Sequence, residues 1–357
     1  MRIGLGVRAR SSSLHDALDF VERAADLPID SLWAVATPGH DPFVVASQAW
    51  SRMRSRGREV LTGTGVVPVA EWRLTSLAGA AATLAELQGG GFRLGLGAGR
   101  LDSAAWRDAH GIAASSRPIA ALREAVAALR GLLAGDAITT DGTLERLREV
   151  GLGVTAPRVP LYLGAAGPAL VDLAGEVADG VYGAALAPED LTDLRARLVA
   201  ARRSSALAVP AQICVAQPLL VDEDGARARA RLVDQAAALV LPLPGLARTR
   251  GFHGQLLRLG FGDDLAVLQR GRAAGVEAAV LEARLSRAFV SRLGIAGTPE
   301  ETAEQIGAYA GLADELSLAV PTTTDAGLLG RALDLARSRL TATPDRTDPD
   351  TPSREEA

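Results

Sequence analysis

Lysine is absent from this 357-residue chain, so every basic side chain other than the four histidines is arginine. A lysine Schiff base, a Walker-type phosphate loop and a Ser-x-x-Lys nucleophile are therefore excluded, because each of them needs a lysine amine. Cysteine occurs once, at Cys214, so no disulfide can form within the chain. A single cysteine fits a reducing compartment, and we expect a cytoplasmic protein.

Long apolar runs are also missing. No stretch approaches the roughly 20 apolar residues that span a bilayer, and the first residues show no features of a secretory signal. We therefore expect no association with membranes. The formal net charge of −4 argues against nucleic acid as the main partner. Aromatic residues make up only 4% of the chain, so the core must be aliphatic.

Strand-like and helix-like segments alternate along the chain. Short apolar runs predict strands, and apolar residues at helical spacing predict a helix after each of them. The eight predicted strands are 3–7, 31–36, 60–67, 92–96, 161–164, 180–183, 212–221 and 316–321. Such alternation favours an α/β fold, the (β/α)8 TIM barrel, with its active site at the C-terminal ends of the strands. A doubly wound sheet with an added helical domain is the alternative.

Two segments, 135–158 and 242–293, interrupt this alternation. We expect both to be insertions at the C-terminal face of a single domain that spans residues 1–340. The second insertion has mostly helical spacing, and two interpretations stay open: a cap over the barrel that shapes the substrate pocket, and a structural helical hairpin. Residues 341–357 are rich in Pro, Asp, Thr and Glu and have no apolar residues to bury, which predicts a disordered tail.

Two glycine-rich stretches follow predicted strands. The stretch 95–99 (GLGAG) lacks the G-x-G-x-x-G spacing of a dinucleotide fingerprint. In a barrel, its glycines would let the backbone approach a ligand closely, although a plain tight turn is the alternative. The stretch 164–168 (GAAGP) joins a strand directly to a helix, so its amides and the helix dipole would attract an anion such as a phosphate. A compact turn of small residues is the alternative there.

Several polar residues are candidates for chemistry. The histidines do not sit at metal-ligand spacing, so we expect no metal site. His40 follows the second strand and is a candidate proton donor, with a solvated loop histidine as the alternative. Glu71 follows the third strand and is the other catalytic candidate. Arg100 and His253 are candidates for binding an anionic group of a substrate.

Seven short runs occur in the order found in one protein family. They are 32–33 (LW), 41–45 (DPFVV), 63–66 (GTGV), 92–99 (FRLGLGAG), 160–168 (PLYLGAAGP), 178–181 (ADGV) and 297–301 (GTPEE). Together they resemble the luciferase-like monooxygenase superfamily, and within it the branch related to methylenetetrahydromethanopterin reductase. The resemblance implies a TIM barrel, usually a homodimer, that binds FMN or the deazaflavin coenzyme F420 and moves hydride equivalents.

The resemblance also implies where the cofactor would lie. Members of the F420 branch have a non-proline cis peptide behind the cofactor ring, and the matching bond here is Gly65–Val66. By the same matching, the residues expected to contact the cofactor are Thr37, Gly65, Val66, Gly97, Gly99, Ala165, Ala166, Gly167 and Pro168. Most of these contacts would come from the main chain.

This chain departs from one group of relatives at two positions. F420-dependent sugar-phosphate dehydrogenases look similar, but they carry an Asp-His pair after the second strand and a glutamate after the fourth-strand glycines. Here those positions hold Ala36-Thr37 and Arg100. Arginine cannot act as an acid or base near neutral pH, so the specific dehydrogenase chemistry is not expected.

Three functions therefore stay open. The first is an F420-dependent oxidoreductase that transfers hydride between the deazaflavin and a small organic substrate. The second is an FMN-dependent luciferase-like monooxygenase on the same barrel. The third is a cofactor-binding barrel without catalysis, an alternative motivated by the missing acid–base residues.

Overall fold

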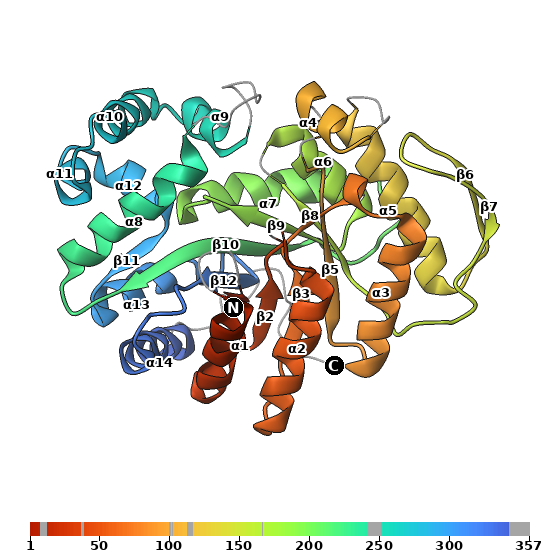
Figure 1. Ribbon diagram of the computed structural model, residues 1–357, viewed down its shortest axis with the longest axis horizontal. Coiled ribbons are helices and arrows are strands. Elements are labelled where there is room, and N and C mark those ends of the chain that lie inside the picture. The colour runs from red at the N-terminus through yellow and green to blue at the C-terminus, as the bar shows by residue number, and fades with distance from the viewer. Residues whose placement is uncertain are drawn as a thin grey trace, which may run out of the picture.

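A closed parallel barrel forms the centre of the molecule (Figure 1). The computed structural model describes residues 1–7, 13–36, 39–99, 101, 103–112, 117–165, 167–241 and 251–342. The barrel strands are β1 (Arg2–Val7), β2 (Ser31–Ala34), β3 (Leu61–Thr64), β5 (Phe92–Gly97), β8 (Leu161–Gly164), β9 (Gly180–Ala184), β10 (Gln212–Val221) and β12 (Glu315–Ala319). They pair in this order, and β12 pairs with β1 to close the ring. The predicted barrel is confirmed and the doubly wound alternative is wrong.

Helices surround the barrel and connect its strands. They are α1 (Leu14–Arg23), α2 (Pro42–Ser55), α3 (Leu74–Leu87), α5 (Pro118–Ala134), α6 (Pro168–Val177), α7 (Pro188–Arg202), α8 (Gly225–Val240), α13 (Pro299–Gly307) and α14 (Ala326–Ala342). Local signals set their starts: the Asp41 carboxylate accepts from the amides of Phe43 and Val44, and Pro42 is the first residue of α2. An Asp followed by Pro is a sequence signal for a helix start, and here it marks the start of α2.

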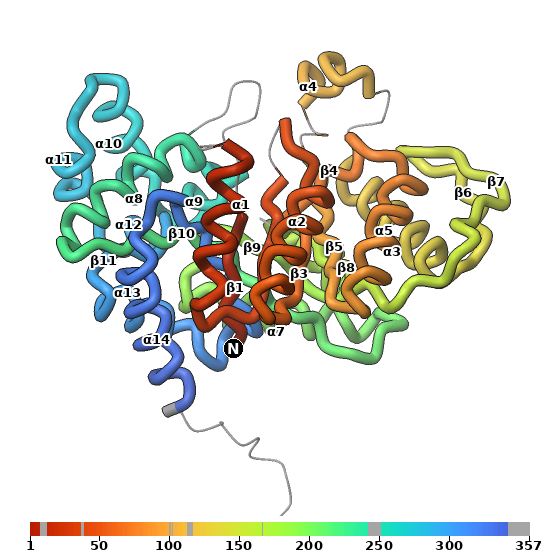
Figure 2. Tube along the Cα trace, turned by 60° about the horizontal axis from the view of Figure 1, so that its bottom comes forward, coloured from red at the N-terminus to blue at the C-terminus, as the bar shows by residue number. Residues whose placement is uncertain are grey.

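Additional elements lie on opposite sides of the barrel (Figure 1). Within 135–158, β6 (Ile138–Asp141) and β7 (Arg146–Val150) form an antiparallel hairpin. On the other side lie α9 (Gly251–Arg258), α10 (Gly262–Ala273), α11 (Ala278–Glu282), α12 (Arg287–Leu293) and β11 (Ile295–Gly297), which pairs with β10. The remaining short elements are η1 (Ala24–Asp26), β4 (Val67–Pro68), η2 (Val69–Glu71) and α4 (Ala104–Ala109), and α4 projects from the end of the barrel opposite to the N-terminus (Figure 2).

The predicted tail begins two residues too early. Thr341 and Ala342 belong to α14, where the Thr341 hydroxyl donates to the carbonyl oxygens of Arg337 and Ser338 one turn back. The rest of the predicted tail, 343–357, lies outside the described residues, as does 242–250 of the second insertion.

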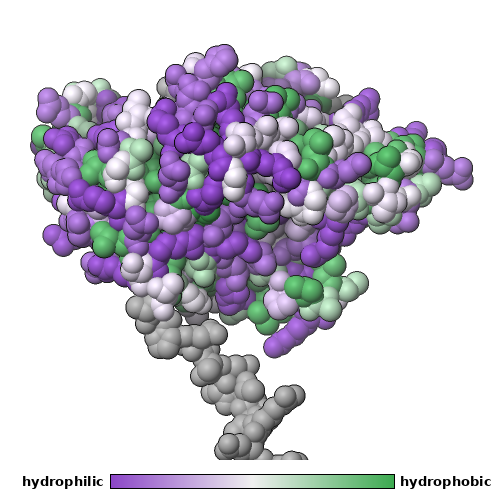
Figure 3. Space-filling model, turned by 90° about the horizontal axis from the view of Figure 1, so that it is seen from below, coloured by the Kyte–Doolittle hydropathy of each residue, from purple (hydrophilic) through white to green (hydrophobic). Residues whose placement is uncertain are grey.

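The outward face of the barrel wall is apolar and is covered by the helices. Residues that point outward from the strands, such as Leu5, Leu94, Leu163 and Leu318, are fully buried and join the main apolar core beneath the helices. The outer surface seen in Figure 3 is mostly hydrophilic with scattered apolar residues. Within the described part of the chain, no helix is long and apolar enough to cross a membrane.

Candidate active site

Small residues face the inside of the barrel at the C-terminal ends of the strands. Because their strand neighbours belong to the outer core, the inward-facing positions at this end are Gly6, Gly97, Gly164, Ala184, Ala216 and Ala319. Gly164 and the three alanines are partly exposed, although their outward neighbours are buried. Solvent therefore reaches these four positions from inside the ring. We call this end the barrel mouth; it is the end at which barrel enzymes place their active sites.

Val66 follows β3 and packs against glycines of β5 and β8 at the mouth. The Gly65–Val66 peptide bond is cis, which confirms the prediction made from the family resemblance. A Cβ atom added to Gly97 would lie 2.8 Å from Val66 Cγ2, and one added to Gly164 would lie 3.0 Å from the same methyl group. Glycine on β5 and β8 therefore leaves the space that Val66 occupies. Gly65, Val66, Gly97 and Gly164 come from three separate sequence motifs, and the structure brings them together.

A tight turn follows β5. Gly99 has φ +60°, a left-handed conformation that favours glycine, and an added Cβ would lie 2.9 Å from Pro68 Cβ. The turn therefore brings its main chain close to the end of β4. Arg100, the next residue, lies outside the described residues, as do Thr37 and Ala166.

The turn between β8 and α6 gathers positive charge. Gly167 caps α6 and has no side chain to accept from the first amides, and Pro168 occupies the first helical position. The N-terminal end of the helix dipole therefore remains available to an anion. Arg258 of α9 adds a guanidinium: its Nη2 atom lies 3.7 Å from the position that a Gly167 Cβ would take. Ala165, on the strand side of this turn, is buried.

Arg258 has no predicted role, although its position on the helix carries a signal. Gln255 and Arg258 stand three residues apart on α9, a spacing that places them on one helix face. Gln255 Nε2 donates to the Ala185 carbonyl oxygen over 3.1 Å, so this face packs on the loops after β8 and β9. The helical spacing alone places Gln255 and Arg258 on one face of α9. It does not show which loops that face contacts.

The other polar candidates occupy separate places. His253 is buried in α9, and its Nδ1 lies 3.0 Å from the Val240 carbonyl oxygen of α8, so its role toward a substrate stays a prediction. His40 is partly exposed and precedes α2, and Glu71 is an exposed residue that ends η2. Partial burial raises the pKa of the Glu71 carboxyl, and the charge of nearby His110 offsets part of that rise. His40 and Glu71 remain catalytic candidates.

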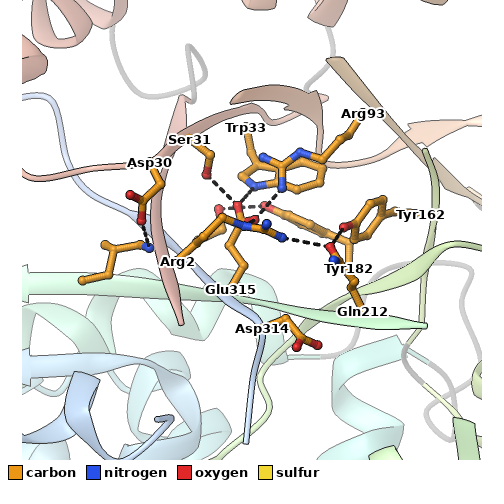
Figure 4. A network of polar contacts seen from close by, with 12 residues as sticks. Arg2, Asp30, Ser31, Trp33, Arg93, Tyr162, Tyr182, Gln212, Asp314 and Glu315 are labelled. Carbon is orange, nitrogen blue, oxygen red and sulfur yellow. Dashed lines mark hydrogen bonds and ion pairs between the residues drawn. The ribbon is translucent and has the colours of Figure 1, made fainter. Parts of the chain in front are cut away.

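A polar network fills the barrel below the mouth (Figure 4). Glu315 Oε1 accepts from Ser31 Oγ over 2.5 Å and from Trp33 Nε1 over 2.6 Å. Its other oxygen binds Arg2 Nε at 3.0 Å and also pairs with Arg93. Burial by itself would raise the pKa of Glu315, but the Arg93 guanidinium and these hydrogen bonds hold it below its usual value. The carboxylate therefore stays ionised in the interior.

Among the described residues, no group of three His, Cys, Asp or Glu side chains is placed to hold a metal ion. The site therefore offers main-chain amides, an arginine and a few titratable side chains around a mouth of small residues. Such a donor set suits a flat organic group with a phosphate attached.

Comparisons with known proteins agree with this geometry. A family model for luciferase-like monooxygenases matches residues 1–315. The chain is 30% identical to 5,10-methylenetetrahydromethanopterin reductase of Methanolobus tindarius over 246 residues, which cover 68% of this chain and 72% of that protein. It is 32% identical to F420-dependent glucose-6-phosphate dehydrogenase of Beutenbergia cavernae over 196 residues, covering 50% of this chain and about half (55%) of that protein.

Solved structures share the fold at lower identity. The coenzyme F420-dependent tetrahydromethanopterin reductase of Methanopyrus kandleri superposes with a TM-score of 0.71 at 17% identity, over 95% of this chain and 98% of that one. An F420-dependent secondary alcohol dehydrogenase gives a TM-score of 0.68 at 18% identity, over 96% and 99% of the two chains. The chain therefore belongs to the luciferase-like monooxygenase family of oxidoreductases.

Proposed function

We propose that this chain is an F420-dependent oxidoreductase that transfers hydride between the deazaflavin ring and a small organic substrate. One observation carries the proposal: Gly65 and Val66, the mouth glycines and the α6 N-terminus lie together at one end of the barrel. The relatives described above support it. The two dehydrogenases and the Methanopyrus kandleri reductase are named as F420-dependent, and the Methanolobus tindarius reductase is named for methylenetetrahydromethanopterin.

The residues present fit this cofactor. Among the described residues other than its chain neighbours, only Arg258 comes within 4 Å of a Cβ built on Gly167, so the described part of the chain leaves space beside that turn. The α6 amides and the Arg258 guanidinium would hold the cofactor phosphate. The main chain at Gly65, Val66, Gly97 and Gly99 would lie against the ring. The bound deazaflavin would supply hydride chemistry, while the protein orients it and excludes water.

Substrate protonation needs a group from this chain. Arginine cannot provide it near neutral pH, so His40 and Glu71 remain our candidates. The raised pKa of Glu71 brings its carboxyl closer to a proton-donating range. We also propose that Arg100 and His253 bind an anionic group of the substrate.

We further propose a cytoplasmic homodimer in which the predicted domain, residues 1–340, together with the last two residues of α14 forms one unit. The single cysteine supports the compartment, and the family resemblance supports the dimer. Analytical ultracentrifugation tests the dimer directly: a mass of two chains is expected, and a single-chain mass at micromolar concentration would contradict it.

The function is tested by mixing the purified protein separately with F420 and with FMN and following cofactor fluorescence. We expect F420 to bind at least about tenfold more tightly than FMN, a difference of about 1.4 kcal/mol. Tight binding of FMN alone would favour the monooxygenase. Tight F420 binding without oxidation or reduction of any alcohol, aldehyde or imine tested would favour the non-catalytic barrel.

A further inference from the structure

Two aromatic rings meet across the barrel axis just below the mouth. Trp33 lies on β2 and Tyr182 on β9, which are four strands apart in either direction around the ring. Their ring centroids are 4.8 Å apart. Trp33 is completely buried, whereas Tyr182 is 9% exposed and lies two residues before the mouth position Ala184. We call this pair the aromatic floor.

The floor is held in place from below (Figure 4). The Trp33 indole donates to Glu315, and the Arg93 guanidinium lies over the Trp33 ring with its carbon 4.2 Å from the ring centroid. The hydroxyl groups of Tyr182 and Ser317 share a hydrogen bond of 3.2 Å. Each ring therefore has both an apolar contact and a directional polar contact, which together fix its orientation.

The floor also touches the residues that define the mouth. A Cβ atom on Gly65 would lie 2.6 Å from Tyr182 Cζ and 2.8 Å from its hydroxyl oxygen. Only glycine permits such an approach, so the phenol ring packs directly against the main chain of the cis pair. A change in the position of this ring would be transmitted to Gly65–Val66 without an intervening side chain.

We propose that Tyr182 is a positioning residue for the cofactor. Its hydroxyl, anchored on Ser317, holds the phenol beneath Gly65. The floor then keeps the flat cofactor ring across the mouth, where the substrate can reach it, and prevents the ring from sinking into the barrel. The inference rests on the proposed function and deepens it, because it concerns how the same site orients its ligand.

The chain contains a matched control for this role. Tyr162 belongs to the same interior cluster, is 2% exposed, and donates its hydroxyl hydrogen to Gln212 Oε1 over 2.6 Å. Its ring lies beside Gly180, at the N-terminal end of β9. Tyr162→Phe and Tyr182→Phe therefore each remove one buried hydroxyl, but only the Tyr182 hydroxyl lies against Gly65 of the mouth.

The test measures F420 affinity and the visible absorption spectrum of bound F420 in wild type, Tyr182→Phe, Ser317→Ala and Tyr162→Phe. We expect Tyr182→Phe to weaken F420 binding about 3- to 10-fold and to shift the bound spectrum. Ser317→Ala removes the same hydrogen bond from its other end and should reproduce both effects if Tyr182→Phe folds poorly. Tyr162→Phe should bind F420 like the wild type, whatever its thermal stability.

Three results would contradict the inference. Wild-type affinity and spectrum in both Tyr182→Phe and Ser317→Ala would reject a positioning role. Equal weakening by Tyr162→Phe would show that the effect is general loosening of the interior. A wild-type protein that does not bind F420 at all would reject the proposed function, and this inference with it, and is recognised before any variant is made.

Discussion

The two ends of the barrel interior are built on the same strands but from opposite kinds of residues. The N-terminal half is filled by large side chains, with the buried pair Arg93–Glu315 packed against the rings of Trp33 and Tyr162. The mouth has glycine and alanine at the equivalent inward positions. Side chains therefore make the contacts at one end, and the main chain is left to make them at the other.

Along the barrel axis, the residues that stabilise the fold are therefore separate from those that would bind a ligand. A buried carboxylate that binds two arginines, a serine and an indole fixes the lower layer and cannot easily move. A mouth of small residues contributes few contacts of its own, but it lets a ligand approach the strands. Substitutions in the lower layer should thus change folding, and those at the mouth should change binding.

The largest effect is expected from Glu315→Gln. The change leaves the charge of Arg93 buried without its partner, so the free energy of unfolding should fall by about 3–5 kcal/mol. Urea denaturation measures the loss. The control is Glu223→Gln, which breaks an exposed pair with Arg331 and should cost less than about 1 kcal/mol. Equal losses in the two variants would show that the lower layer is not specially stabilised.

Gly97→Ala should disturb the packing of the mouth. The new methyl group would lie 2.8 Å from Val66 Cγ2, and such overpacking costs about 1–3 kcal/mol. Gly6→Ala is the control, because there the nearest atoms are 3.5 Å away, an ordinary contact. Thermal unfolding should distinguish them, and a stable Gly97→Ala with unchanged cofactor binding would contradict the packing described around Val66.

Arg258→Ala should weaken the binding of F420. Loss of the guanidinium beside Gly167 is expected to reduce F420 affinity about tenfold, as for one charged hydrogen bond of about 1.5 kcal/mol. Fluorescence titration measures the affinity, and Arg331→Ala on the outer surface serves as the control. Unchanged affinity in Arg258→Ala would place the phosphate elsewhere.

The smallest effect concerns pH. The pKa of Glu315 is lowered in the folded protein from an ordinary value of 4.5, so its stabilising effect is present above that value and is lost as the pH falls through the lowered pKa. The difference in unfolding free energy between wild type and Glu315→Gln should therefore shrink as the pH falls below 4.5. A constant difference would mean that Glu315 does not titrate in this range.

The sequence predicted the features that depend on local chemistry. Apolar periodicity located the barrel strands, and the Asp41–Pro42 cap located the start of α2, because both signals lie within a few neighbouring residues. The cis Gly65–Val66 bond came from family resemblance alone. The β6–β7 hairpin was missed because its short strands pair with each other and have no buried apolar face to produce a pattern.

Features that depend on barrel closure could not be predicted in this way. Arg93 and Glu315 are 222 positions apart and meet only because β5 and β12 face the same interior. Arg258 reaches Gly167 through the packing of an inserted helix, and Tyr182 meets Trp33 from the opposite wall. Each of these contacts is set by strand register and helix docking, which a single sequence does not specify.

The central claim is that the small-residue mouth holds F420 through main-chain groups. A crystal structure of the F420 complex tests it most directly. We expect the deazaflavin ring across the mouth against Gly65–Val66, above Tyr182, with the phosphate at Gly167 and Arg258. A ring bound outside the mouth, or a phosphate far from the α6 N-terminus, would contradict it.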